Sequence, residues 1–346
     1  MKPSLQDIAQ RAGVSTATVS RALNDRAGVN PDTREQILSL AREMGYMPSM
    51  AARSLATSRT YNLGMLTYKH TPQPIGSYHV QIAQGIDYEA QARGYHVITR
   101  FVDDEMMSNG ERLPLVAEQR TDGLILVGPA LKAPFIIELY NSGVPIVLVD
   151  NLLNETKLDA VVCDNIDGTH QITRHLIETH GLERLVFLSG PAHWFSSRER
   201  CAGYESALAL SGLKPRVGTM PDTTVHTGYA AMLRVLDEQP DVQGVVAVND
   251  ATAVGAIRAC KERGRRVPED VAVVGFDNVA WGPLHDPPLT TVGMFKYETG
   301  VQAARRLIDV IERGSATPFQ LRLGVDLVIR RSCGCLPAEH SLFPHE

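Results

Sequence analysis

The stretch SLQDIAQRAGVSTATVSRALN, residues 4–24, contains two short amphipathic segments that meet at a glycine. Ser4 can cap a helix, and Asp7 follows three residues later, which is the spacing of a capping box. From Leu5 to Ala12, apolar residues recur at i, i+3, i+4 and i+7. This period predicts a helix with one buried face.

Two more helices are expected directly after the first. Gly13 permits a sharp turn, and Ser15 can cap a second helix, whose inward face would comprise Val19, Ala22 and Leu23. A third helix is predicted to begin at Asn30-Pro31, because proline is favoured at the first helical position. Its buried stripe would comprise Ile37, Leu40, Ala41 and Met44, and Gly45 would end it.

A short helix, a tight turn and a second exposed helix form the helix-turn-helix arrangement, whose second helix fits the major groove of DNA. Arg21 could bind a guanine or a phosphate, and the small side chains of Thr16 and Ala17 could approach base edges. The candidate DNA contacts of this head are Leu5, Ser15, Thr16, Ala17, Thr18, Ser20, Arg21 and Asn24. The alternative interpretation is a three-helix core that has no partner.

The charge of the chain is unevenly distributed. Residues 1–60 hold eight Lys/Arg and five Asp/Glu, so 8 − 5 = +3, which leaves −5 − 3 = −8 for the remainder. A basic head on an acidic body is typical of a DNA-binding module joined to another function.

Composition limits the class of protein and its location. The 346 residues are 44% hydrophobic and 21% charged, which is typical of a globular protein with two or three folding units. Neither a membrane span nor a secretory signal is expected, because there is no run of 18 apolar residues and the N-terminus is polar. The odd number of five cysteines favours a reducing cytoplasm.

The next segment, YMPSMAARSL at residues 46–55, predicts a helix of only one and a half turns. So short a helix is marginal in water, because its nucleation costs more than its few hydrogen bonds return. We expect it to form only where a partner stabilises it.

Residues 5–24 and the later stretch VNPDTREQILSLAREMGYMPSMAARSL make the chain similar to the lactose-repressor (LacI/GalR) family of bacterial transcription regulators, a resemblance that continues to about residue 336. It implies that residues 49–56 fold on DNA as a hinge helix. It also implies that Leu55 acts there as an apolar wedge in the minor groove, with Arg53 as a nearby DNA contact. The alternative for Leu55 is packing against the body.

Beyond residue 61, short apolar runs bounded by turn residues alternate with helical stretches: NLGMLT, YHVITRF, DGLILVG, VPIVLVD, RLVFLSG, GVVAVND, VAVVGFD and TTVGM. This alternation predicts parallel sheets with helices on both faces. An internal echo between residues 141–150 and 262–277 favours two lobes. The family resemblance implies the two-lobed fold of periplasmic sugar-binding proteins.

The resemblance and the strand pattern together predict the domains. Residues 1–48 form the helix-turn-helix domain, residues 49–60 the hinge helix and linker, residues 61–336 the ligand-binding and dimerisation core, and residues 337–346 a tail. The first lobe comprises about 61–160 and 292–318, and the second about 161–291 and 319–336. The tail holds two prolines and no heptad repeat, so a tetramerising helix is not expected and a homodimer is predicted.

Ligands of parallel α/β sheets bind at the carboxyl ends of strands, where Asp150 and Asp277 are expected, one from each lobe. The resemblance adds Arg200 and Asn249, while Tyr78 and Trp194 could stack on a sugar ring. The alternatives are a helix cap for Asp277, a structural ion pair with Glu199 or Asp277 for Arg200, and ordinary packing for the two aromatic residues. One departure is that Met294-Phe295 stands where family members often have Gln-Pro.

The sequence contains no motif of catalysis. G-x-G-x-x-G after a strand, the P-loop, H-E-x-x-H and G-x-S-x-G are all missing. His170, His175 and His180 recur every fifth residue, and on a helix this spacing rotates successive side chains by about 140°. Cys333 and Cys335 alone cannot fill a tetrahedral zinc site. We therefore predict no enzyme, no cofactor and no metal.

The sequence thus predicts a homodimeric repressor that binds a palindromic operator on double-stranded DNA and is controlled by a small molecule in a cleft between two lobes. A sugar is favoured over a purine or nucleoside, because only 6% of residues are aromatic. A phosphoprotein co-regulator remains an alternative within this class. The rival classes are a sugar-binding transport protein, which the head opposes, and a sugar-modifying enzyme, which the missing catalytic motifs oppose.

Overall fold

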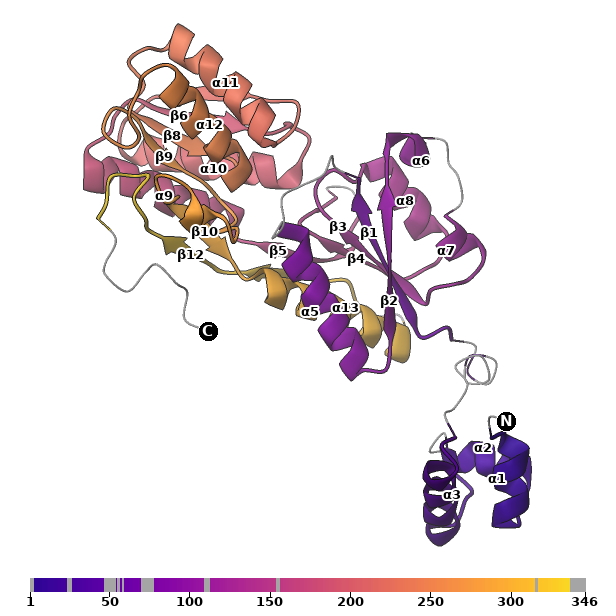
Figure 1. The fold of residues 1–346 in the computed structure, drawn as a ribbon. Helices are drawn as coiled ribbons and strands as arrows, with labels where there is room; N and C mark the ends of the chain where they lie inside the picture. Colours follow the sequence, from indigo (N-terminus) through magenta and orange to yellow (C-terminus); the bar gives the residue numbers. More distant parts are fainter. Residues whose placement is uncertain are drawn as a thin grey trace. The chain divides into compact units, whose positions relative to one another are not determined.

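The computed structural model describes residues 3–23, 27–46, 54, 57, 59–69, 78–108, 113–153, 156–314 and 317–336. It divides into two compact units, a head of Met1–Tyr61 and a body of Asn62–Glu346 (Figure 1). Asn24, Arg53 and Leu55, three of the predicted DNA contacts, lie outside the described residues.

The head contains the three predicted helices, α1 (Leu5–Ala12), α2 (Thr16–Leu23) and α3 (Pro31–Glu43). The capping box is present, since Ser4 N donates to Asp7 Oδ2 at 2.7 Å and Asp7 N donates to Ser4 Oγ at 3.3 Å. Each helix contributes one fully buried large residue, namely Ile8, Val19 and Ile37. These three side chains share one small core, which the apolar period of the sequence predicted.

The first sheet of the body is parallel, in the order β11-β5-β4-β3-β1-β2. Its strands are β1 (Asn62–Tyr68), β2 (His96–Val102), β3 (Gly123–Val127), β4 (Ile146–Val149), β5 (Asp159–Cys163) and β11 (Gln320–Leu323). Its helices are α5 (Tyr78–Ala92), α6 (Asp104–Ser108), α7 (Pro114–Ala117), α8 (Ala133–Asn141) and α13 (Lys296–Arg313).

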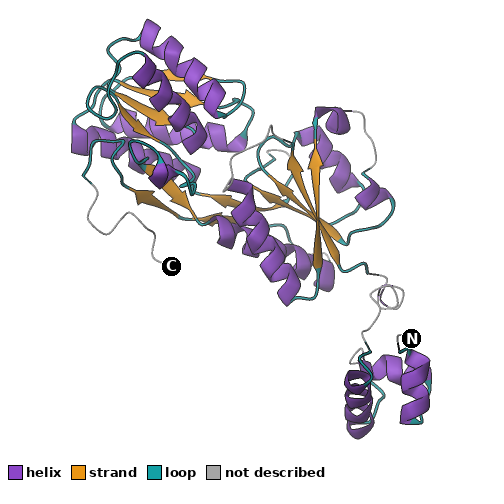
Figure 2. Cartoon of the chain, viewed as in Figure 1, coloured by secondary structure: helices purple, strands orange, loops and turns teal. Residues whose placement is uncertain are grey.

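The second sheet is also parallel, in the order β7-β6-β8-β9. Its strands are β6 (Leu185–Ser189), β7 (Val217–Thr219), β8 (Gly244–Ala247) and β9 (Ala272–Val274). Its helices are α9 (Asn165–His180), α10 (Phe195–Leu210), α11 (Val225–Glu238) and α12 (Asp250–Glu262), and a short 3-10 helix spans Gly282–Leu284. Figure 2 shows these helices packed around the strands, as the predicted fold class requires.

The chain passes from the first sheet to the second lobe after β5. A two-stranded antiparallel sheet of β10 (Thr291–Met294) and β12 (Val325–Val328) flanks the return through α13 and β11. The predicted lobe boundaries near 160 and 319 were therefore early. Both β5 and β11 belong to the first sheet, where they pair with each other in parallel.

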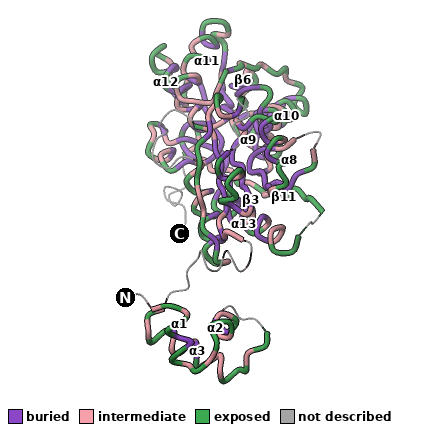
Figure 3. The backbone as a smooth tube through the Cα atoms, turned by 90° about the vertical axis from the view of Figure 1, so that its right-hand side faces the viewer, coloured by how far each residue is buried: buried purple, intermediate pink, exposed green. Residues whose placement is uncertain are grey.

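Burial explains why these strands read as continuous apolar runs. In β3, β4, β5, β6 and β8 every residue is buried, as expected of parallel strands covered on both faces. Figure 3 shows the same contrast between buried strands and helices with exposed outer faces. No helix of the described residues is long and apolar enough to cross a membrane.

Helices α5 and α13 lie side by side against the first sheet (Figure 1). A Cβ atom on Gly85 of α5 would lie 2.0 Å from the carbonyl oxygen of Tyr297 on α13. The two backbones approach this closely only because residue 85 has no side chain.

Candidate functional site: a helix-turn-helix head and an interlobe cluster

The exposed surface of α2 carries the predicted DNA contacts that the structure describes. Thr16, Ala17 and Arg21 are exposed. Ser15 is exposed as well and caps the helix, because its Oγ accepts from Thr18 N at 3.1 Å. Thr18 and Ser20 are half-buried, and Leu5 packs against the head core.

In the body, four predicted ligand contacts lie just beyond the carboxyl ends of parallel strands. Tyr78 begins α5, which follows β1, and Asp150 directly follows β4. Arg200 lies on α10, which follows β6, and Asp277 comes three residues after β9. We call Tyr78, Asp150, Arg200 and Asp277 the interlobe cluster, because two come from each lobe.

A buried ion pair forms the centre of the interlobe cluster. Arg200 Nη1 lies 3.3 Å from Asp277 Oδ1, and the two side chains are 5% and 11% exposed. The same guanidinium donates through Nε to Asn165 Oδ1 at 2.8 Å and through Nη1 to the Val248 carbonyl at 2.6 Å. It also stacks 3.7 Å above the ring centroid of Phe276. Arg200 is therefore held in one orientation before any ligand arrives.

Asp150 is the group of the interlobe cluster with the most perturbed ionisation. Burial raises its pKa to about 7, against the opposing effect of the Arg200 charge. Burial also raises the pKa of the Tyr78 hydroxyl, with the Asp150 charge as the next cause. The Tyr78 hydroxyl and Asp150 Oδ1 have no hydrogen-bond partner among the residues that the structure describes. Two buried polar atoms without partners are costly in a folded protein.

Comparison with known proteins adds to this geometry. Residues 4–49 match the family described as "Bacterial regulatory proteins, lacI family", and residues 173–333 match "Periplasmic binding protein-like domain". The HTH-type transcriptional regulator CelR of Thermobifida fusca is 34% identical over 337 residues, covering 96% of this chain and 98% of that protein.

The chain belongs to the lacI family of bacterial regulatory proteins.

Solved structures of LacI-family relatives agree with this assignment along the whole chain. A lac repressor dimer bound to operator and the anti-inducer ONPF aligns with a TM-score of 0.80 at 27% identity, covering 96% of this chain and 99% of that one. A CelR–cellobiose complex aligns with a TM-score of 0.72 at 32% identity, covering 95% and 99%. The chain is thus a DNA-binding transcription regulator, and its relatives are regulators, not enzymes.

Two further predicted ligand contacts of this LacI-family regulator have structural partners. Asn249 caps α12 by accepting from Thr252 N at 2.9 Å, and its Nδ2 donates to the Thr223 carbonyl at 3.1 Å. Trp194 is buried directly before α10, with its ring edge-on to His193. A ligand contact by either residue stays a prediction.

Sequence reasoning missed two residues that support the interlobe cluster. Asn165 is fully buried and accepts from Arg200 Nε. Lys296 donates through Nζ to the Asp277 carbonyl and, at 3.0 Å, to that of Asn278. The available signal for Asn165 was the repeated Asp-Asn or Asn-Asp pair after a strand, seen in VCDN, AVND and GFDN. No local pattern distinguished Lys296 from a surface lysine.

Met294, the departure from the family pattern, also contacts the interlobe cluster. Its sulfur lies 3.9 Å from Arg200 Nη2, and the residue is buried. Phe295, which follows it, is 49% exposed. At this position the wall beside Arg200 is therefore thioether, not amide.

The sequence-based expectation about the histidines was wrong for two of them. The rings of His175 and His180 lie edge to face with centroids 5.0 Å apart, and Cys333 and Cys335 join them. His180 is the last residue of α9, and Gly181 turns the chain directly after it. The 140° rotation separates Cβ directions along a helix, whereas long imidazole side chains at a helix end can converge on a neighbouring segment.

Proposed function

We propose that this chain is a repressor that binds a palindromic operator as a homodimer and is controlled by a sugar at the interlobe cluster. One observation carries the ligand site: the unpartnered Tyr78 hydroxyl and Asp150 Oδ1 are buried beside the Arg200–Asp277 pair. A ligand that supplies a donor to Asp150 and a partner to Tyr78 would remove both penalties.

The chemistry of the interlobe cluster favours a polyol. Carboxylates accept from vicinal hydroxyls and a guanidinium donates to them, each through paired, charge-assisted hydrogen bonds. The related structure of CelR is a complex with cellobiose. The thioether of Met294 adds an apolar contact, which suits the carbon face of a sugar ring.

An exposed aromatic surface on the body supports the homodimer. Tyr88 on α5 is 61% exposed and Tyr297 on α13 is 44% exposed, and their ring centroids lie 5.9 Å apart. Val80, also on α5, is 46% exposed. Aromatic side chains are enriched at protein interfaces, so we place the dimer contact on α5 and α13.

Dimerisation also explains how the head reaches specificity. One helix-turn-helix contacts few base pairs, while two related by a two-fold axis recognise half-sites about one helical turn apart. The family resemblance adds residues 49–56 as a hinge helix and Leu55 as its wedge. On this proposal Leu55→Gly abolishes tight operator binding and leaves ligand affinity unchanged. Retained operator affinity would contradict the hinge.

Control by the ligand requires that it bind one conformation of the body better than the other. Closure around the interlobe cluster would change the spacing at which two paired hinge segments emerge, and hence whether they pack. Couplings of this kind amount to about 1–3 kcal/mol.

The test is a thermal-shift screen of the full chain against mono- and disaccharides, sugar phosphates and purines. A saturating ligand at a hundredfold excess over its Kd stabilises the folded state by about 2.7 kcal/mol. A saccharide hit confirmed by calorimetry supports the proposal. A purine hit overturns the ligand class, and the absence of any hit points to a protein co-regulator.

Two tyrosine variants test whether the hit binds at the interlobe cluster. Tyr78→Phe removes a buried hydroxyl that has no hydrogen-bond partner among the described residues. The unliganded protein should keep or gain stability, and ligand affinity should fall roughly tenfold. Tyr204→Phe is the matched control, because the Tyr204 hydroxyl donates to the Leu185 carbonyl at 2.9 Å inside the second lobe. It should lose stability and keep its affinity; the reverse result contradicts the assignment.

A further inference from the structure

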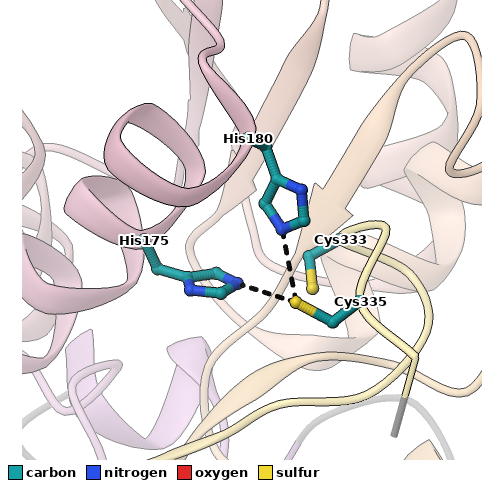
Figure 4. A group of neighbouring side chains, drawn as sticks. All are labelled: His175, His180, Cys333 and Cys335. Carbon is teal, nitrogen blue, oxygen red and sulfur yellow. Dashed lines mark hydrogen bonds between the residues drawn. The ribbon is translucent and has the colours of Figure 1, made fainter.

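Two histidines and two cysteines converge in the second lobe, away from the residues of the interlobe cluster. His175 lies in α9 and His180 ends it, while Cys333 and Cys335 follow β12 (Figure 4). One ligand atom from each side chain can be chosen so that all four lie within 4.8 Å of one another. Figure 4 shows both imidazole rings pointing toward the Cys335 sulfur.

The distances suit a tetrahedral metal ion. Cys335 Sγ lies 3.6 Å from His175 Nε2 and 3.4 Å from His180 Nε2. A tetrahedron with metal–sulfur bonds of about 2.3 Å and metal–nitrogen bonds of about 2.0 Å has sulfur–nitrogen edges of roughly 3.5 Å. Its sulfur–sulfur edge is roughly 3.8 Å, so the 4.8 Å limit on the ligand atoms leaves a contraction of at most about 1 Å.

The segment that carries the cysteines is fixed by hydrogen bonds. Ser332 N donates to the Pro288 carbonyl at 3.0 Å, and Ser332 Oγ donates to the Val273 carbonyl at 2.6 Å. Gly334, between the two cysteines, has a φ of +106° and lies against the His180 ring, which a Cβ atom would approach to 3.3 Å. Only glycine adopts this conformation without strain, so the C-G-C spacing and the position of His180 are linked.

Two neighbouring hydroxyls support the putative ligands' orientation from outside the cluster. His175 directs Nε2 toward Cys335 and Nδ1 toward Thr179 Oγ1, which lies 3.3 Å away. Thr290 Oγ1 donates to Cys333 Sγ at 3.1 Å. Partners of this kind orient metal-binding histidines and stabilise thiolates in metal sites.

We propose that His175, His180, Cys333 and Cys335 bind one zinc ion through four protein ligands. Two thiolates and two imidazoles in tetrahedral array are the ligand set of structural zinc sites. Binding releases the two thiol protons to solvent and leaves both histidines neutral. The ion fills its coordination with protein atoms, so its role is structural: it joins the end of α9 to the segment after β12 in the second lobe.

The experiment uses the full chain without an affinity tag, reduced, freed of metal and titrated with Co²⁺ and then Zn²⁺. We expect one equivalent of Co²⁺ to give the intense visible bands of tetrahedral coordination with thiolate charge transfer, and Zn²⁺ to displace it. Saturating zinc should raise the thermal midpoint by on the order of 5 °C. Octahedral Co²⁺ spectra, or no spectral change at all in the folded protein, would overturn the proposal.

Variants separate this site from adventitious binding. Cys335→Ser and His180→Gln should each abolish the tetrahedral Co²⁺ spectrum and the zinc-dependent stabilisation. Cys201→Ser is the control, since Cys201 faces Glu205 on α10 and lies outside the cluster; its spectrum should match that of the wild type. A wild-type spectrum in Cys335→Ser contradicts the assignment. So does a Cys333–Cys335 disulfide in protein purified under reducing conditions.

Discussion

Arg200 on α10 and Asp277 after β9 form a buried ion pair of 3.3 Å although 77 residues separate them in the chain. Asn165, the Val248 carbonyl and the Phe276 ring hold the arginine in place. The pair can therefore serve both of the roles that the sequence left open. It links two elements of the second lobe, and it presents fixed charges to a ligand.

Asp277→Asn should lower both stability and ligand affinity. Removing one partner of a buried pair leaves an uncompensated charge, which costs about 3–5 kcal/mol. We expect a lower thermal midpoint and at least a tenfold weaker ligand in calorimetry. Asp241→Asn is the matched control, because it breaks the solvent-exposed Arg216–Asp241 pair, and exposed pairs contribute little. An unchanged dissociation constant in Asp277→Asn would remove Asp277 from the ligand site.

Asp150 should make the unliganded body more stable at pH 5 than at pH 8. Burial raises its pKa to about 7 in the folded protein, compared with 3.8 as the ordinary value. The folded state therefore holds a proton that the unfolded state has lost, and this contribution to stability disappears as pH rises through 7. Asp250 titrates in the same direction, since burial raises its pKa to about 7 as well.

The check is the thermal midpoint between pH 5 and pH 8 in the wild type and in Asp150→Asn. The variant should show a smaller decline with rising pH. Asp241→Asn should leave the decline unchanged, because the Arg216 hydrogen bond lowers the pKa of Asp241 and moves its titration below this window. Equal declines in the wild type and Asp150→Asn would refute the role of Asp150.

Tyr88→Glu with Tyr297→Glu should convert the dimer into monomers. Charged side chains are depleted from interface cores, so two glutamates on the paired faces of α5 and α13 should repel their symmetry mates. Sedimentation across a range of concentrations measures the shift. Leu210→Glu is the control, because Leu210 is 77% exposed at the end of α10. A wild-type chain that sediments as a monomer at all concentrations would contradict the dimer itself.

Arg21→Ala should weaken binding to DNA that the wild type enriches from a random library. Loss of a bidentate base contact costs about 1–3 kcal/mol, or about tenfold to more than a hundredfold in affinity. If Arg21 contacts a phosphate instead, the loss should be uniform across sequences, with a smaller salt dependence. Arg42→Ala, an exposed arginine on α3, controls for net charge. Equal losses in the two variants would mean that α2 is not the recognition helix.

The sequence by itself determined the elements and their order. The capping box at Ser4 and Asp7, the glycine at residue 13 and the apolar period of the head are local signals, so they could be read without a structure. Continuous apolar runs such as DGLILVG predicted buried parallel strands for the same reason. The short β5 and β11 were harder to place, because their sheet is decided by a pairing between strands about 160 residues apart.

The tertiary structure decided which side chains meet. Asp150 and Asp277 could be predicted at strand ends, but the unpartnered Tyr78 hydroxyl and the supporting contact of Asn165 depend on how α5, α9 and α10 pack. His175 and His180 looked unsuited to a common site on one helix, and Cys333 and Cys335 looked like an incomplete pair. They converge because folding brings the segment after β12 against the end of α9, a contact that carries no signature in either segment.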